Sequence, residues 1–512
     1  MSRVWNQDRA KTHIDQKIES VKTVTIKTYG RDMSLENIPS SVAYRVDAVH
    51  MYVDIQNIGD ILNTTEIEGE LCHKRTLRFL DQHYRAIRRV LDRVEAKRVD
   101  IHNTRLHSLF TKPYNSEAGA EKKRIQKAVA TAQLLIDVLA QTKDDDKQIP
   151  AAKLRVGIDT GETLAVNNGR NGNREPLFLG DAANHAAKLA SNSTPKGIYL
   201  TNAARKILNL AEQSAPEKVA LNKDEIEDCC IAANLGTSAD KIVEEWRDDL
   251  AKNPLSGYDF TRHTPPLSTI DIEALTPGNS RRQEAISIYA DIDGFTSYVA
   301  SNVKNNAEDV VRVLHVLRAE LERVLSKEFE GRRVRFIGDC VHGLFCEGTA
   351  AKTDEPKTVA NATLLAGAFR SSFNLAIERL KASGYATGDL GLSVGFELGP
   401  MTLTRLGVKA DRIRCSISRG LLRSESEQCR CKGNETAIGP IAYSAAPEAI
   451  QKLFGTGRKR ADMDYTSADT ALNPKEESKK NNSSLLKPAT AASAGFSFKA
   501  AAEPSRTLAG FS

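Results

Sequence analysis

The sequence lacks the features of membrane-spanning and secreted proteins. No stretch of the chain approaches the roughly 18 consecutive apolar residues that a membrane-spanning helix needs. The first eight residues, Met-Ser-Arg-Val-Trp-Asn-Gln-Asp, do not follow the pattern of a signal peptide. We therefore expect a cytoplasmic protein that has no membrane partner.

Cysteine is sparse, with eight residues in a chain of 512. No two cysteines have the spacing of a metal-ligand pair, and Cys429 and Cys431 are too close together for the usual zinc knuckle. A chain of this length does not need a disulfide framework. We expect free thiols at all eight positions, which are Cys72, Cys229, Cys230, Cys340, Cys346, Cys415, Cys429 and Cys431.

Strong charge of one sign is also missing. The net charge of +6 is spread through the chain, which gives little reason to expect a nucleic-acid partner, although it would suit a small anionic substrate. The content of 40% apolar and 27% charged residues is that of an ordinary soluble protein. The length leaves room for about two to four domains, each with its own core.

Two acidic stretches stand out in the second half. The apolar run that starts at Ile286 ends in Asp291 and is followed by Gly294-Phe295-Thr296, as in a strand that leads into a tight turn. The stretch around Asp339 has an apolar arm on each side of Gly338-Asp339, which predicts a hairpin with Asp339 at its turn. Two carboxylates at neighbouring strand ends would suit Mg²⁺ or Mn²⁺.

The second half repeats the order of the first. Asp291 follows Asp54 by 237 positions, Phe345 follows Phe110 by 235, and Gly395 follows Gly157 by 238. A near-constant offset over three landmarks predicts an internal duplication in which each copy is one α/β (α+β) domain.

The predicted organisation has five parts. The ends and the connection are polar, and the last part is rich in Ser, Ala, Lys and Asn, which predicts a disordered tail. The parts are an N-terminal extension (1–40) with one added strand (22–27), a first domain (41–213), a linker with a charged helix (214–280), a second domain (281–452) and the tail (453–512).

The acidic stretches with Asp291 and Asp339 resemble the two metal-binding segments of class III nucleotide cyclases, and the resemblance covers both copies. It implies a ferredoxin-like βαββαβ core in each copy, with the copies packed as an intramolecular pseudo-heterodimer. It also implies that a ribonucleoside triphosphate is converted to its 3′,5′-cyclic monophosphate and pyrophosphate. In this family the active site lies between two catalytic domains, and each domain contributes different groups.

The resemblance assigns the metal-binding half of the site to the second copy. Asp291, Asp339 and the backbone carbonyl of Ile292 would hold two divalent cations, Mn²⁺ or Mg²⁺, which lower the pKa of the ribose 3′-hydroxyl. Backbone N–H groups of the following turn would bind the β- and γ-phosphates. The turn residues are Gly294, Phe295 and Thr296.

The first copy would supply the other half, on the helix that follows Gly180. Asn184 would hold the ribose, and Lys188 would neutralise the charge that develops on the α-phosphate. The spacing of four places both side chains on one helix face. Lys188 stands where the family has arginine, so we expect weaker geometric control without loss of function.

The opposite combination of halves is predicted to be a degenerate pocket. The first copy keeps Asp54 but has Thr104 at the second metal position. In the second copy, Arg419 and Arg423 are predicted to occupy the positions of the family's Asn and Arg.

Three residues of the first copy are predicted to select the base. Asp100 and Leu177 stand at the positions that distinguish adenylate from guanylate enzymes, and Tyr52 should protrude toward the pocket and reduce its volume. A carboxylate only accepts hydrogen bonds, so Asp100 favours a base edge with a donor, such as N3–H of uracil, the amino group of cytosine, or guanine. A small pocket with one acceptor suits a pyrimidine, with UTP favoured over CTP.

These features resemble the bacterial pyrimidine cyclases of Pycsar anti-phage defence. That resemblance implies a partner protein that responds to the cyclic nucleotide product. The alternatives are a guanylate or adenylate cyclase of general signalling, and a catalytically silent nucleotide-binding regulator. The chain could act as a monomeric pseudo-dimer or as a homodimer.

Overall fold

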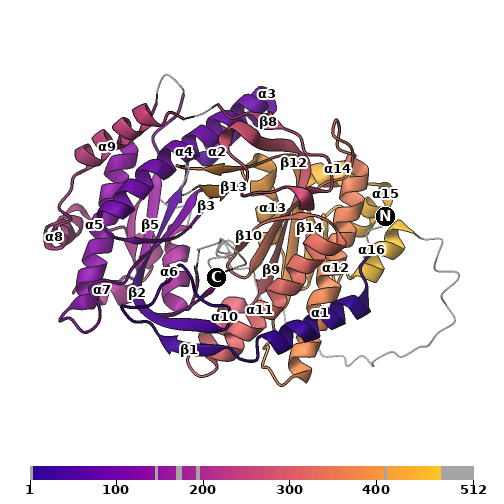
Figure 1. Ribbon diagram of the computed structural model, residues 1–512, viewed down its shortest axis with the longest axis horizontal. Coiled ribbons are helices and arrows are strands. Elements are labelled where there is room, and N and C mark those ends of the chain that lie inside the picture. Colours follow the sequence, from indigo (N-terminus) through magenta and orange to yellow (C-terminus); the bar gives the residue numbers. More distant parts are fainter. Residues whose placement is uncertain are drawn as a thin grey trace.

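The chain contains two mixed β-sheets, one in each half. The computed structural model describes residues 4–144, 148–168, 176–191, 196–255, 257–408 and 412–473. In Figure 1 the first half lies on the left and most of the second half on the right. All eight cysteines are free thiols, as predicted. Within the described ranges, every helix is too short or too polar to cross a membrane.

The first sheet has the strand order β3-β4-β2-β5-β6, with β1 beside β2 and β7 beside β5. The elements of this copy are β2 (Val42–Ile55), α2 (Ile58–Leu62), α3 (Thr65–Glu68), α4 (Glu70–Arg93), β3 (Lys97–His102), β4 (Arg105–Phe110), α5 (Ala120–Gln141), β5 (Leu154–Asn167), β6 (Pro176–Leu179), α6 (Asp181–Ala190), β7 (Gly197–Leu200) and α7 (Asn202–Ile207).

The second sheet has the order β10-β11-β9-β12-β14-β15, with β13 beside β12 and β8 (Phe260–Thr261) beside β9. The elements are β9 (Ser280–Asp293), α10 (Phe295–Asn302), α11 (Ala307–Arg323), β10 (Arg332–Ile337), β11 (Cys340–Phe345), α12 (Glu355–Ala382), β12 (Gly391–Leu406), β13 (Ile413–Cys415), α13 (Arg419–Cys429), β14 (Glu435–Ile438), α14 (Pro440–Ala445) and α15 (Glu448–Phe454).

Strand registers confirm the predicted duplication. Tyr52 of β2 lies opposite His107 of β4 and Gly157 of β5. The second copy repeats this arrangement, because Tyr289 of β9 lies opposite His342 of β11 and Gly395 of β12. Both tyrosine rings stack on their histidines, with centroids 4.1 and 4.3 Å apart. The two sheets therefore match residue by residue.

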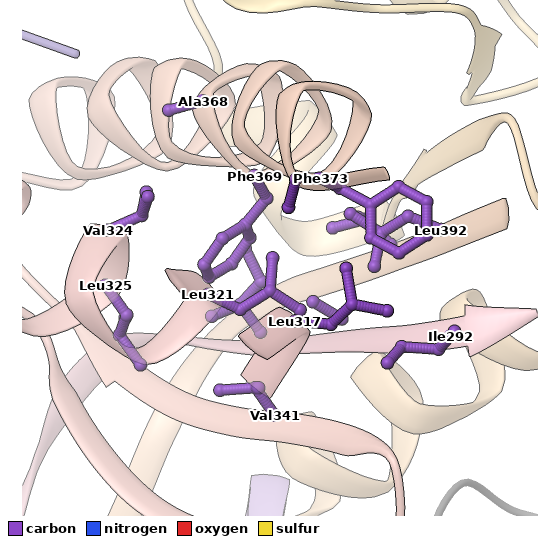
Figure 2. Packing of buried hydrophobic residues seen from close by; sticks show 14 of the residues in the cluster. Ile292, Leu317, Leu321, Val324, Leu325, Val341, Ala368, Phe369, Phe373 and Leu392 are labelled. Carbon is purple, nitrogen blue, oxygen red and sulfur yellow. The ribbon is translucent and has the colours of Figure 1, made fainter. Parts of the chain in front are cut away.

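Alternation along β9 separates the core from the site. Ile288, Ala290 and Ile292 belong to the hydrophobic core with α11 and α12. Figure 2 shows Ile292 in this core with Leu317 of α11 and Phe373 of α12. Because successive side chains of a strand point to opposite faces, Asp291 points to the other face of the sheet, which α13 covers.

Each copy also inserts a hairpin into the core of the other. Leu164, Val166 and Leu179, from β5 and β6, belong to the core cluster of the second copy. In return, Ile413 and Ile417, from the β13 region, belong to the core cluster of the first. Burial of apolar surface thus stabilises the two copies together.

Buried charges contact one arm of each hairpin near the end of its longer strand. The carboxylate of Asp81 on α4 accepts a hydrogen bond of 2.8 Å from the backbone N–H of Gly407. The guanidinium of Arg318 on α11 donates to Asn168 Oδ1 over 2.6 Å. Asp81 and Arg318 are both buried, so these hydrogen bonds to Gly407 and Asn168 form where water cannot compete.

The N-terminal extension joins the two copies. α1 (Gln7–Ser20) buries Ala10, Ile14 and Ile18, spaced four apart, and it packs on α11 and α12 of the second copy. In Figure 1 this indigo helix lies beside the second half of the chain. β1 (Thr25–Thr28) then pairs in parallel with β2 of the first copy, which accounts for the strand predicted near residues 22–27.

The linker contains two helices where one was predicted. α8 (Lys223–Ala233) and α9 (Ala239–Lys252) both pack on α5, and so belong to the first copy. α9 buries Ile242, Val243 and Trp246, and the Trp246 indole N–H donates to the carbonyl of Gln82.

The tail begins later than predicted. β15 (Lys459–Ala461) pairs with β14, and α16 (Tyr465–Leu472) packs on α12 at Gly367. A Cβ atom at Gly367 would lie 2.7 Å from the carbonyl oxygen of Asp464, so the glycine permits this contact. The prediction of disorder from residue 453 is therefore wrong for residues 453–473, while residues 474–512 lie outside the described residues.

Gly395 is predicted to be essential for the packing of α13 on β12. A Cβ atom there would lie 2.1 Å from the backbone nitrogen of Gln428, so Gly395→Ala must push α13 away from the sheet. We expect a loss of about 2–3 kcal/mol in the free energy of unfolding, measured by urea denaturation. The control is Gly59→Ala in α2, where nothing lies within 4 Å and the change should be below about 1 kcal/mol. Equal effects of the two substitutions would contradict this account.

Candidate active site between the two copies

Asp291 and Asp339 lie at the same edge of the second sheet, near Cys340. β9 and β11 pair through Ala290 and Val341, so the next residues along are Asp291 and the turn that contains Asp339. Gly338 in this turn has φ +59°, which favours glycine. Burial, and the charges of both aspartates, raise the pKa of the Cys340 thiol, so both carboxylates lie near Cys340.

The groups at this edge fit a divalent cation. Two residues of the neighbouring strands flank Asp291. Ser393 of β12 lies opposite Asp291, and Cys340 of β11 precedes Val341, the partner of Ala290. Both residues are small and uncharged. Across the described ranges, no three His, Cys, Asp or Glu side chains are placed to share a metal ion. Two carboxylates do not complete the coordination of a cation, and the carbonyl of Ile292 is the group predicted to add a third ligand. This all-oxygen set suits Mg²⁺ or Mn²⁺.

In the first copy, arginines stand at the positions of these two small residues. Asp54 lies opposite Arg105 of β4 and Arg155 of β5. Arg105 Nε is 3.7 Å from Asp54 Oδ1, and the Thr104 hydroxyl donates to the same oxygen over 3.0 Å. A fixed guanidinium thus lies beside the carboxylate that corresponds to Asp291, the predicted metal ligand of the second copy.

Arg105 also reaches the second copy. Its Nη1 lies 3.4 Å from Oε1 of Glu425 on α13, and the side chains of Asp54, Arg105 and Glu425 are at most 15% exposed. Burial raises the pKa of Asp54 and of Glu425, and the charge of Arg105 opposes both shifts. These three residues form a buried ionic cluster, which we call the Arg105 cluster.

The helix α6 carries Asn184 and Lys188 and packs beside α10 of the second copy. Asn184 is buried, whereas Lys188, one turn later, is exposed. α6 contacts α10, the helix that begins directly after Gly294. Arg45 of the first copy also donates to the carbonyls of Val303 and Lys304 after α10, over 3.1 Å each. The helix that carries Asn184 and Lys188 thus lies beside the helix that follows Asp291 in the chain.

The turn predicted to bind phosphates forms the start of α10. Gly294 has φ +82° and precedes the first helical residue, Phe295, whose side chain is buried in the core. Thr296 is half-buried. Backbone N–H groups in the first turn of a helix have no partner within the helix, which suits them to an anion.

The predicted alignment of α13 is wrong by three residues. Built Cβ atoms on the matching glycines, Gly157 and Gly395, come close to the backbone nitrogens of Ala190 and Gln428, respectively. Hence Ala190 matches Gln428, an offset of 238. The positions of Asn184 and Lys188 then match Leu422 and Ser426, because α6 and α13 begin at Asp181 and Arg419, which are also 238 positions apart.

The arginines placed there by the sequence have another role. Arg419 matches Asp181 at the start of the helix, and Arg419 and Arg423 lie 2.6 and 3.9 Å from Glu66 on α3. Leu422 packs against two hydrophobic clusters and offers no amide for a ribose. The second combination of halves thus lacks two cyclase groups, and the Arg105 cluster fills its metal side.

The predicted base residues lie near the boundary between the copies. Asp100 forms an ion pair with Arg335 of the second copy, with Nη1 at 3.1 and 3.4 Å from the two carboxylate oxygens. Tyr52 is buried, packs against Ala186 and Ala187 of α6, and its pKa is raised by burial and by the charge of Asp100. Tyr52 and Asp100 are therefore neighbours.

Leu177 is half-buried and packs against the core cluster of the second copy. The sequence interpretation missed Arg335 as the partner of Asp100, Arg105 as a cation beside Asp54, and Gln428 beside Asp291. The repeat offset could have pointed to Arg335, which follows Asp100 by 235 positions.

Comparison with known proteins identifies related chains. A family model described as adenylate and guanylate cyclase catalytic domain matches residues 43–228. A protein named uridylate cyclase from Pseudomonas aeruginosa is 65% identical over 472 residues, which are 92% of each chain. A second uridylate cyclase, from a Rhizobium species, is 37% identical over 440 residues, or 82% of each chain.

A solved structure has a similar fold over most of the chain. It is the crystal structure of a protein described as a class III adenylyl cyclase-like ATP-binding protein from Pseudomonas aeruginosa. The TM-score is 0.91 at 65% sequence identity, and the match covers 92% of this chain and 100% of that one.

The Arg105 cluster leads to a pH-dependent prediction. Arg105→Ala removes the cation that the two buried carboxylates share, so we expect a loss of about 3 kcal/mol in the free energy of unfolding at pH 8. Removal of Arg105 raises the pKa of both carboxyls further, and the folded variant then binds more protons than the unfolded chain. Its stability should therefore recover as the pH falls toward 5.

The control for this prediction is Arg419→Ala, which removes an exposed ion pair at the same boundary and should cost less than about 1 kcal/mol. Urea denaturation at several pH values measures both variants. A loss for Arg105→Ala that stays constant with pH would contradict the ionic role of the cluster.

Proposed function

We propose that this chain, which belongs to the class III nucleotide cyclase family, converts UTP to 3′,5′-cyclic UMP and pyrophosphate at one site between its two copies. The observation that carries the proposal is the division of groups between the copies. Small uncharged residues flank Asp291 in the second copy, arginines flank Asp54 in the first, and only α6 of the first copy has Asn184 and Lys188. One combination of halves is therefore complete.

Each half has a defined part in the reaction. Asp291, Asp339 and the Ile292 carbonyl would hold two divalent cations, Mn²⁺ or Mg²⁺, which when bound lower the pKa of the 3′-hydroxyl and neutralise the triphosphate. The N–H groups at the start of α10 bind the β- and γ-phosphates.

The first copy orients the nucleotide. The buried amide of Asn184 fixes the ribose, so that the 3′-oxygen lies in line with the α-phosphorus and the bond to pyrophosphate. The exposed ammonium of Lys188 reaches the α-phosphate and offsets the negative charge that grows there as the 3′-oxygen attacks.

Asp100 would recognise uracil. A carboxylate has about four lone-pair directions, and Arg335 takes two, which leaves acceptors for N3–H of the base. Cytosine has an acceptor at N3, so it would face the carboxylate with the wrong polarity. Tyr52 fills space beside Asp100, which favours a single-ring base. The named uridylate cyclase relatives support this choice.

The product would act as a cytoplasmic second messenger. We propose that it reaches an effector protein that binds the cyclic nucleotide, as part of defence against phage. One chain contains one complete site, so a monomeric pseudo-dimer is sufficient for the reaction.

A comparison of triphosphates tests the base assignment. Purified protein is incubated with Mn²⁺ and UTP, CTP, GTP or ATP, and cyclic products are measured by mass spectrometry. We expect cyclic UMP, and a rate with CTP at least about 10-fold lower, because a hydrogen bond to a charged acceptor is lost. Cyclic GMP as the main product would overturn pyrimidine selectivity, and no product from any triphosphate would overturn the activity.

A matched pair of substitutions tests the division of the site. Asp339→Asn should lower kcat/KM by at least about 10²-fold, because it removes a charged metal ligand. Asp54→Asn, at the matching edge of the other copy, should keep activity within about 10-fold. Circular dichroism checks that both variants fold. The opposite order of effects would show that the first copy binds the metal.

A further inference from the structure

Gln428 lies in a buried position beside Asp291. It is near the end of α13 and only 2% exposed. Its Nε2 lies 3.1 Å from Asp291 Oδ2 and 2.7 Å from the Ser393 hydroxyl. An ionised carboxylate can only accept hydrogen bonds, so the amide nitrogen must face Asp291, which fixes the orientation of the Gln428 amide.

The same contacts link Asp291 to the sheet. The Ser393 hydroxyl accepts from Gln428 and lies 3.4 Å from the backbone carbonyl of Asp291. Gln428 thus bridges the side chain of Asp291 and a residue of the neighbouring strand. A donor to Oδ2 restricts rotation of the carboxylate, and so sets the direction in which Asp291 presents its oxygens to a ligand.

The first copy lacks the glutamine and the serine of this bridge. Ala190 occupies the position of Gln428, and Arg155 occupies that of Ser393. The bridge therefore exists only in the copy that has both aspartates. If Gln428 served only to pack α13 on the sheet, α6 would need a similar group for the same contact, yet α6 packs on β5 with alanine there.

Gly395 makes the bridge possible. It allows the backbone of α13 to approach β12 so closely that a Cβ atom would lie 2.1 Å from the Gln428 nitrogen. A glutamine side chain is long enough to extend from this point of contact along the sheet to Asp291. The close packing of helix and strand therefore sets the position from which Gln428 acts.

We propose that Gln428 is a positioning residue for Asp291, which orients this carboxylate for the divalent cation. The inference rests on the proposed metal site. Hydrogen bonds to metal-binding carboxylates orient them, and loss of such a partner typically lowers metal affinity by about 10- to 100-fold. Gln428 itself does not touch substrate.

The test measures Mn²⁺ binding in the absence of turnover. Gln428→Met keeps the length of the side chain and removes the donor. Binding is followed by the electron paramagnetic resonance signal of free Mn²⁺, with 3′-deoxy-UTP present, because this nucleotide has no 3′-hydroxyl and cannot cyclise. We expect the Kd for Mn²⁺ to rise by about 10- to 100-fold.

The control is Gln283→Met, at the other end of the same strand. Gln283 is also buried, and it donates to Cys346 and accepts from the backbone N–H of His263. We expect Gln283→Met to lower the thermal midpoint but to leave the Kd for Mn²⁺ unchanged. If it weakens Mn²⁺ binding as much as Gln428→Met does, the effect is one of general stability, and the proposal is wrong.

Asp291→Asn separates the two ways in which the proposal could fail. If Asp291→Asn leaves Mn²⁺ binding unchanged, the proposed metal site itself is wrong. If Asp291→Asn weakens binding and Gln428→Met does not, the metal site stands and only the role of Gln428 is overturned.

Discussion

The exchange of hairpins between the copies is the interaction on which the rest of the structure depends. The β5–β6 hairpin completes the core of the second copy, and the β12–β13 hairpin completes that of the first. Neither core can be filled without the other copy, so the boundary between them is fixed by close packing. That boundary is where α6 meets α10, and where Asp100 meets Arg335. Burial of apolar side chains thus sets the positions of the residues at this boundary.

The two copies have different charges at the matching edges of their sheets, beside Asp291 and beside Asp54. At one edge, the strand residues that flank Asp291 are uncharged, as a site for a cation would need. At the other, Arg105 and Arg155 supply the positive charge permanently, and Arg105 reaches across to Glu425. The same backbone therefore serves in one place as a site for a ligand and in the other as an ionic contact that joins the copies. Both uses need burial, because water would weaken the interactions.

The repeated strands and the two aspartates could be predicted from the sequence. Alternation of apolar residues along a strand, and glycines at a turn, are local properties that the sequence shows directly. The pair of Asp100 with Arg335 could not, since it depends on how two copies face each other. The register of α13 was misjudged because two arginines spaced by four imitate the family's pattern, whereas backbone contact at Gly395 sets the true alignment. α1 and α16 both pack on α12. Each is a short polar segment, and the sequence of such a segment does not show that another helix will stabilise it.

The N-terminal segment and the linker tie the two copies within one chain, and this covalent connection has a kinetic consequence. Partners joined in one chain meet at an effective concentration that the connection sets, whatever the amount of protein in the cell. Assembly of the site is then independent of expression level, unlike in a homodimer that dissociates on dilution.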